Sequence, residues 1–178
     1  MVNSNELRLI VDELVAALRR YDKLRFDELQ SRELGPPATP DQVARLSHVL
    51  RFVLPPSWRA FLSIHNGWQN FRGTAKILST EDYGLPWVNQ RVKDWEDLLD
   101  GQVNPFGDGR QPVLLGTDES SFLVVDPTTV RADGEMSFIM YDYLQEERRF
   151  PDFASYLRHH LSIMRALISR EDGAPANP

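Results

Sequence analysis

The chain has 178 residues, of which 42% are hydrophobic and 26% are charged, and its formal net charge is −6. These proportions are those of an ordinary globular protein, and the length suits one domain with a sizeable core. No apolar run approaches the roughly 18 to 20 residues that a membrane helix requires, and no secretory signal is visible. The absence of cysteine excludes disulfides and thiolate metal sites. We therefore expect a cytoplasmic protein without a membrane partner.

The negative charge is concentrated in the middle of the sequence. Residues 81–142 contain thirteen acidic and four basic residues, a net charge of −9, whereas the remainder carries +3. An acidic surface repels phosphate, so direct binding of nucleic acid is not expected. Such a surface favours a basic protein partner and speeds the encounter with it. The alternative is that these acidic residues only solvate surface loops.

Two helices are predicted in the first fifty residues. Apolar residues recur at helical spacing from Leu7 to Tyr21, which predicts an N-terminal helix from residue 5 to about residue 30. After a break at residues 35–38, Thr39-Pro40-Asp41-Gln42 has the form of a capping box that opens a second helix. This second helix is expected to bury four apolar side chains, those of Val43, Leu46, Val49 and Leu50.

The stretch from Leu54 to Trp68 has the features of a complete structural unit. Pro56 suits the first turn of a helix, and Asn66-Gly67 suits its end, because both residues tolerate left-handed backbone. Between them, one helical face carries Trp58, Phe61, Leu62 and His65. We expect the large apolar side chains of this face to anchor the helix on a sheet. Residues 68–78 then favour a strand or one arm of a hairpin.

The second half of the chain has mostly strand character. Residues 80–112 are rich in turn signals, with a short helix expected beside Leu98-Leu99, and three β-type runs follow at residues 112–116, 121–126 and 137–143. Glu146-Glu147-Arg148-Arg149 is interpreted as a solvated charge cluster in a turn. A final helix follows Pro151-Asp152. This order of elements predicts an α+β fold with a mostly antiparallel sheet flanked by helices.

No motif in the sequence indicates catalysis. There is no G-x-S-x-G motif, no glycine-rich phosphate loop and no spacing typical of metal ligands. His159-His160 is the obvious metal candidate, but adjacent helical side chains point about 100° apart and cannot jointly chelate one ion. One of these histidines is predicted to be packed and the other to be partly exposed. We expect no enzymatic activity, cofactor or metal, although a site assembled from distant residues would leave no sequence motif.

The unit at residues 54–68 resembles the signature of the SUKH superfamily, the Smi/Knr-like domain of bacterial immunity proteins and fungal cell-wall regulators. The residues that carry the resemblance are Leu54-Pro55, Trp58, Phe61-Leu62, Asn66-Gly67 and Trp68. A weaker similarity covers the strand ending in Asp126, the strand around Tyr141-Asp142 and the closing helix. The resemblance implies a single SUKH-like domain at residues 34–170, with a helical segment at residues 1–33 packed on it and a disordered tail at residues 171–178.

The same resemblance implies a non-catalytic protein-binding function. The expected role is that of an immunity protein that binds and neutralises a cognate bacterial toxin, and the partner would be a basic toxin domain. The alternative is an intracellular scaffold or regulatory protein without a toxin partner. Candidate partner-binding residues are two tryptophans expected to be exposed anchors, Trp87 and Trp95, and five acidic residues expected to face a basic patch, Asp94, Glu96, Asp97, Asp118 and Glu119.

Overall fold

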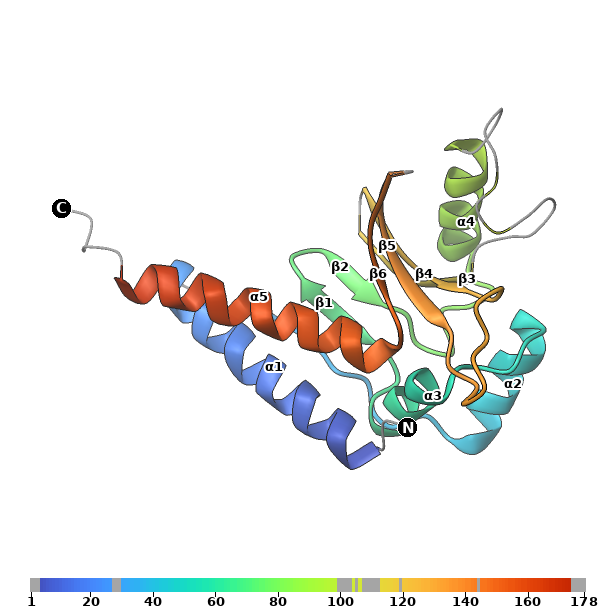
Figure 1. Cartoon of the computed structure of the whole chain (residues 1–178), viewed down its shortest axis with the longest axis horizontal. Helices are drawn as coiled ribbons and strands as arrows, with labels where there is room; N and C mark the ends of the chain where they lie inside the picture. Colours follow the sequence, from blue (N-terminus) through green and yellow to red (C-terminus); the bar gives the residue numbers. More distant parts are fainter. Residues whose placement is uncertain are drawn as a thin grey trace.

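A computed structural model describes residues 4–26, 30–98, 104, 106, 113–118, 120–143 and 145–173. Within them, five helices flank a six-stranded antiparallel sheet whose strands follow one another in chain order (Figure 1). The helices are α1 (Ser4–Arg25), α2 (Pro40–Leu50), α3 (Pro56–Ile64), α4 (Pro86–Leu98) and α5 (Phe153–Gly173). The strands are β1 (Trp68–Arg72), β2 (Ala75–Ile77), β3 (Val113–Thr117), β4 (Ser121–Asp126), β5 (Ser137–Asp142) and β6 (Gln145–Phe150). The predicted α+β fold is confirmed.

Helices α2 and α3 begin where the sequence predicts. Thr39 Oγ1 accepts a hydrogen bond from the Gln42 amide, and Gln42 Oε1 accepts one from the Thr39 amide, which completes the capping box. On α3, Trp58, Phe61 and Leu62 are fully buried in the larger core, as expected for the face that anchors this helix. On α2 the prediction is partly wrong. Leu46 is buried, but Val43 and Leu50 are only partly buried and Val49 is 59% exposed.

The two faces of the sheet pack against different helices. On β4, Leu123 and Val125 point into a larger core shared with α1, α3 and α5, whereas Phe122 and Val124 point into a smaller core beneath α4. Side chains alternate between the faces along a strand, so covering both faces buries nearly the whole of β4. Figure 1 shows α4 standing apart from the other helices.

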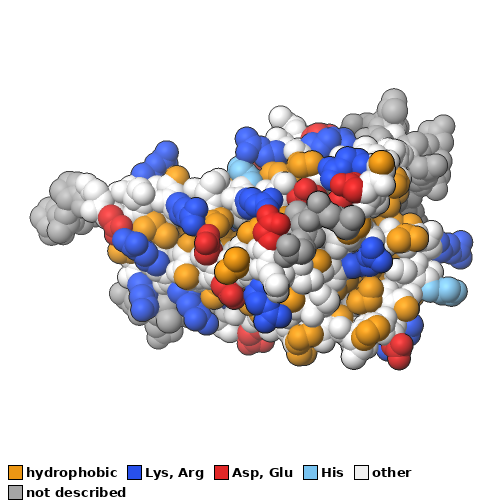
Figure 2. Space-filling view, turned by 60° about the horizontal axis from the view of Figure 1, so that its bottom comes forward, with side chains coloured by type: hydrophobic (Ala, Val, Ile, Leu, Met, Phe, Trp, Pro, Cys, Tyr) orange, Lys and Arg blue, Asp and Glu red, His pale blue; other side chains and the backbone are white. Residues whose placement is uncertain are grey.

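Helices α1 and α5 lie side by side and run in the same direction (Figure 1). Three ion pairs join them with the same offset in sequence, Glu6 to Arg158, Glu13 to Arg165 and Arg20 to Asp172. The ion pairs repeat every seven residues, as in a parallel coiled coil, over a buried apolar seam. Figure 2 shows basic and acidic side chains interspersed along this part of the surface.

The ends of these two helices differ from the predicted boundaries. Helix α1 ends at Arg25 rather than near residue 30, and residues 27–29 lie outside the described part of the chain. Helix α5 continues to Gly173, so residues 171–173, which were expected to belong to a disordered tail, are helical. Ion pairs explain this extension, because Glu171 binds Arg25 and Asp172 binds Arg20 of α1. Residues 174–178 are not among the described residues.

The charged run at residues 146–149 is an edge strand rather than the predicted turn. Strand β6 pairs with β5 along its length, with one irregularity in register opposite Met140 and Tyr141. Arg149 donates across the sheet to Asp126 of β4 (2.6 Å) and along its own strand to Glu146 (3.0 Å), and these contacts place the charges on the sheet. A charged and irregular edge also discourages pairing with another chain.

A buried carboxylate connects three elements on the larger core. Glu135, which precedes β5, is 2% exposed. It accepts hydrogen bonds from the Ser57 amide (2.7 Å) and the Ser57 hydroxyl (2.8 Å) in the first turn of α3. The Ser57 hydroxyl oxygen in turn accepts from the Phe153 amide (3.0 Å) at the start of α5. The starts of α3 and α5 are therefore both held at this carboxylate.

We predict that Glu135→Ala lowers the free energy of unfolding by about 2 to 4 kcal/mol, because it leaves buried donors of Ser57 without an acceptor. The measurement is urea unfolding followed by circular dichroism. Glu147→Ala, at an exposed position on β6, is the control and should change stability by less than about 0.5 kcal/mol. Equal losses in the two variants would contradict the structural role of Glu135.

The two adjacent histidines of α5 have the predicted division of roles. His159 is partly exposed, whereas His160 is 4% exposed and its ring lies edge-on to Tyr156 and Phe71. Burial, together with the smaller effect of the positive charges of Arg72 and His159, lowers the pKa of His160 to about 3. His160 is therefore neutral in the folded protein at neutral pH.

We predict that the protein loses stability as pH falls below 6.5. Between pH 6.5 and about 3 the unfolded chain binds a proton at His160 that the folded protein does not, so stability falls by up to about 1.4 kcal/mol per pH unit. His160→Phe should reduce this slope, as measured by urea unfolding between about pH 7 and pH 5. His48→Phe, at an exposed position, should keep the slope of the wild type. The same slope in all three proteins would exclude His160 as its source.

Candidate functional site

Helix α4 is the element where the structure departs most from the sequence prediction. Residues 80–112 were expected to be irregular with a short helix near Leu98, but α4 starts at Pro86 and has 13 residues. Val88, Val92 and Trp95 recur at positions i, i+4 and i+7, and this stripe is the signal that could have revealed the helix. Val88 and Trp95 are buried in the smaller core, and Val92 packs against it.

Trp95 is not the exposed anchor that was predicted. Its side chain is fully buried, with ring centroids 4.5 Å from Tyr141 and 5.1 Å from Phe122 in edge-to-face geometry. The prediction was wrong because the helical repeat places Trp95 on the same face as Val88, which points inward, whereas its acidic neighbours lie on the outer face. Trp95 therefore attaches α4 to the sheet.

Arg91 makes a second attachment, which the sequence prediction missed. Its guanidinium donates to Thr117 Oγ1 (3.1 Å) and to the Asp118 carbonyl (2.9 Å) at the end of β3. It also lies 4.5 Å from the centroid of the Phe122 ring, a cation–π contact. These partners lie more than 25 residues away in sequence, so no local pattern could have indicated them.

The outer surface of α4 carries four of the predicted partner-binding residues. Trp87 is 38% exposed, with the Lys76 ammonium 4.9 Å from its ring centroid. Asp94 is partly buried and forms an ion pair with Arg91 (3.1 Å). Glu96 and Asp97 are exposed, and within the described residues neither forms an ion pair. These two carboxylates are therefore the acidic groups that α4 offers to a partner.

Asp118 stabilises the turn between β3 and β4. Its Oδ1 accepts from the backbone amides of Ser120 (3.0 Å) and Ser121 (2.8 Å). Burial alone would raise the pKa of Asp118, but hydrogen bonds from Ser121 and Ser120, with the charge of Arg72, hold it below its ordinary value. Its carboxylate is thus ionised and bound within the turn. Glu119 lies outside the described residues.

Hollows lie on both flanks of α4. One has a volume of about 350 Å³, lies toward the β1–β2 hairpin, and brings Trp87, Arg91 and Asp118 together from distant parts of the sequence. The other, of about 370 Å³, lies between α2 and α4, with Glu96 at its wall. Apolar side chains form most of its lining, namely Val49, Leu50, Tyr83, Val88, Val92 and Leu114. The exposed Val49 that contradicted the prediction for α2 thus belongs to this hollow.

Comparison with known proteins leaves the family open. No protein-family model and no curated protein sequence matches this chain. Among the described residues, no group of three or more histidine, aspartate or glutamate side chains is arranged to hold a metal ion. None of the described helices has both the length and the apolar character needed to cross a bilayer. The similarity to the SUKH superfamily therefore stays a prediction.

We predict opposite outcomes for the two tryptophans of α4. Trp95→Ala should lower the free energy of unfolding by about 3 to 5 kcal/mol, because it removes a fully buried ring. Trp87→Ala should cost about 1 kcal/mol or less, because it removes a half-exposed ring and one cation–π contact. Urea unfolding measures both values, and hydrogen exchange should show faster exchange within α4 for Trp95→Ala. A larger loss for Trp87→Ala would contradict these assignments.

Proposed function

We propose that this chain is a cytoplasmic, non-catalytic protein-binding domain, an immunity protein that binds and neutralises a cognate toxin through α4. The sequence resemblance described above supports the role, and the geometry of α4 supports the location. The observation that carries the location is that Glu96 and Asp97 are exposed on α4 and form no ion pair with any described residue, with a hollow on either side of the helix. A partner can therefore contact exposed carboxylates and also insert side chains into the adjacent hollows.

The hollows provide sites where side chains of a partner can be buried, which exposed acidic residues alone do not provide. Interfaces gain most of their binding energy from a few side chains buried in well-packed pockets, with charged groups at the rim. The hollow between α2 and α4 has an apolar lining and one carboxylate, Glu96, at its wall. On the opposite flank, Trp87 offers an aromatic surface. A toxin with an apolar side chain next to lysine or arginine would fit this arrangement.

The acidic residues are expected to act mainly on the rate of association. Exposed rim charges change the encounter rate more than the dissociation rate, and salt screens their effect. A basic surface on the toxin would be steered toward α4 and covered there. Neutralisation then follows from blocking the toxin surface, without any chemical step by this chain.

The test of the role is co-expression with the product of a neighbouring large gene. An immunity protein should form a stable complex with that product and restore growth of cells that express it. A complex without growth rescue would favour the alternative, an intracellular scaffold or regulatory protein. Neither complex nor rescue with any neighbouring gene product would contradict the immunity role.

We predict that charge reversal on α4 slows complex formation. Glu96→Lys and Asp97→Lys should each lower the association rate constant several-fold at low ionic strength, with a smaller effect at high salt. Asp12→Lys, an exposed carboxylate reversed on α1, is the matched control and should leave the rate constant nearly unchanged. Surface plasmon resonance with the co-expressed toxin measures these rates. Equal effects at residues 12, 96 and 97 would show that overall charge, and not α4, controls association.

A further inference from the structure

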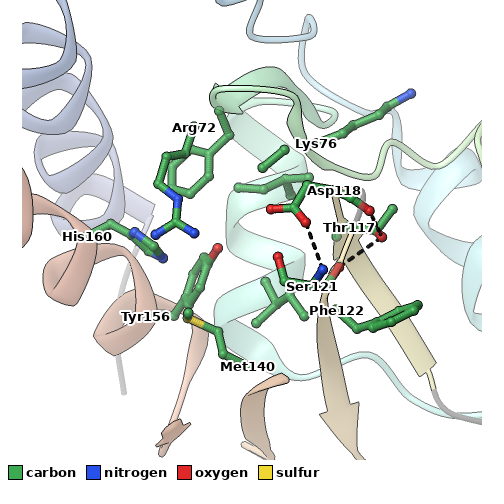
Figure 3. A pocket seen from close by; sticks show the side chains of 14 residues that line it. Arg72, Lys76, Thr117, Asp118, Ser121, Phe122, Met140, Tyr156 and His160 are labelled. Carbon is green, nitrogen blue, oxygen red and sulfur yellow. Dashed lines mark hydrogen bonds between the residues drawn. The ribbon is translucent and has the colours of Figure 1, made fainter. Parts of the chain in front are cut away.

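A separate cavity lies on the opposite side of the Asp118 turn from α4, between the end of β1, the start of β4 and α5 (Figure 3). Its volume is about 30 Å³, enough for one or two water-sized atoms at its base, so the rest of a bound group would lie at its mouth beside Arg72. Arg72 is exposed and His160 is buried, so the cavity leads from the surface inward. It therefore suits the head of a ligand that enters beside Arg72.

Three polar side chains face this cavity with unused hydrogen-bonding capacity. His160 Nε2 is buried and has no hydrogen-bond partner. Within the described part of the chain, neither the Tyr156 hydroxyl nor the Arg72 guanidinium forms a hydrogen bond or an ion pair. Tyr156 and His160 are one turn apart on α5, and Figure 3 shows Arg72 reaching toward both from β1. Buried polar atoms in folded proteins are rarely left without partners, so His160 Nε2, with Arg72 and Tyr156 beside it, indicates a missing group.

The missing group is a hydrogen-bond acceptor. Arginine can only donate, while a tyrosine hydroxyl and a neutral imidazole each have one proton to donate. The other charged groups of the lining are already occupied, since Asp118 accepts two backbone amides and Lys76 forms an ion pair with Asp82 (2.5 Å). What the cavity lacks is thus an acceptor with several lone pairs that matches a guanidinium.

We propose that this cavity binds a small oxyanion group, a carboxylate or a phosphate. The Arg72 guanidinium would pair with two of its oxygens, the Tyr156 hydroxyl would donate to one, and His160 Nε2 would donate from the base of the cavity. The aromatic rings of Phe71 and Tyr156 shield the site from water on the α5 side. The Asp118 carboxylate on the far wall restricts the ligand to one that can bind at the Arg72 side.

This inference does not depend on the immunity role. The cavity shares the wall around Asp118 with one hollow of α4, but the side chains that would hold the anion, Arg72, Tyr156 and His160, do not line that hollow. The oxyanion can have either of two sources. It is a free anion such as phosphate, or it is the side chain of an aspartate or glutamate from another protein.

The test is a titration of the full-length protein followed by amide chemical shifts around residues 72, 116–122 and 156–160. The probes are sodium phosphate and sodium acetate at constant ionic strength, with methylammonium chloride as the probe of opposite charge. The wild type should show saturable shifts with at least one of the two anions and none with methylammonium. No saturable response to either anion, or saturation by methylammonium, would overturn the proposal.

Three variants connect the response to the cavity. Arg72→Gln should weaken anion binding at least tenfold, and Tyr156→Phe, which keeps the ring, should weaken it several-fold. Arg59→Gln removes the same charge from an exposed position on α3 and should bind like the wild type. Circular dichroism confirms that each variant is folded. Wild-type affinity in Arg72→Gln would place the anion elsewhere and reject the site.

A final pair of probes distinguishes a free anion from an acidic side chain of another protein. A capped tripeptide Gly-Glu-Gly presents a carboxylate as a protein side chain does, and Gly-Gln-Gly is its neutral match. Binding of acetate and the glutamate peptide without binding of phosphate would identify an acidic side chain as the ligand. Binding of phosphate without the peptide would identify a free anion.

Discussion

The buried hydrogen bonds of Glu135 and Ser57 set the arrangement of the larger core. Ser57 is 78 residues from Glu135 and 96 residues from Phe153, so this small network closes two long loops of the chain. Burial raises the pKa of Glu135, and the hydrogen bonds from Ser57 oppose that effect. Because the starts of α3 and α5 meet at this point, the stripe of α3 and the seam between α1 and α5 face the same side of the sheet.

The opposite side of the sheet is built on a different principle. Within the described residues, helix α4 has no buried polar network comparable to that of Ser57. Val88 and Trp95 attach it to the sheet by apolar packing, and Arg91 attaches it through the contacts of its guanidinium. Because only a few side chains attach α4, the described residues leave the rest of its surface uncovered. The same feature explains why α4 has hollows on both flanks and why it is suited to contact another protein.

The sequence predicted those parts of the fold that depend on local patterns. The capping box at Thr39, the stripe of α3 and the three central strands follow from spacing and turn chemistry over a few residues. The edge strand β6 could not be predicted in this way, because the contact of Arg149 with Asp126 crosses the sheet. Trp95 was placed at the surface because its acidic neighbours outweighed the helical repeat with Val88.

The candidate sites depend even more on distant contacts. Four residues of the α4 surface could be named from sequence, because aromatic and acidic residues cluster there. The hollow between α2 and α4 could not, since Val49 and Val92 come together only after the chain folds. Arg72 and His160 are likewise far apart in sequence, and each has ordinary neighbours. Their shared cavity is a property of the tertiary structure alone.

The parallel pairing of α1 with α5 has a consequence for how the protein is made. Three of its ion pairs join residues that are 152 positions apart, so α1 leaves the ribosome long before its partner exists. At ordinary rates of synthesis this interval is on the order of ten seconds. During that time the apolar stripe of α1 is exposed to solvent and to other chains. Newly made protein is thus more prone to capture by chaperones than the finished fold. The larger core is completed only after α5 has been synthesised.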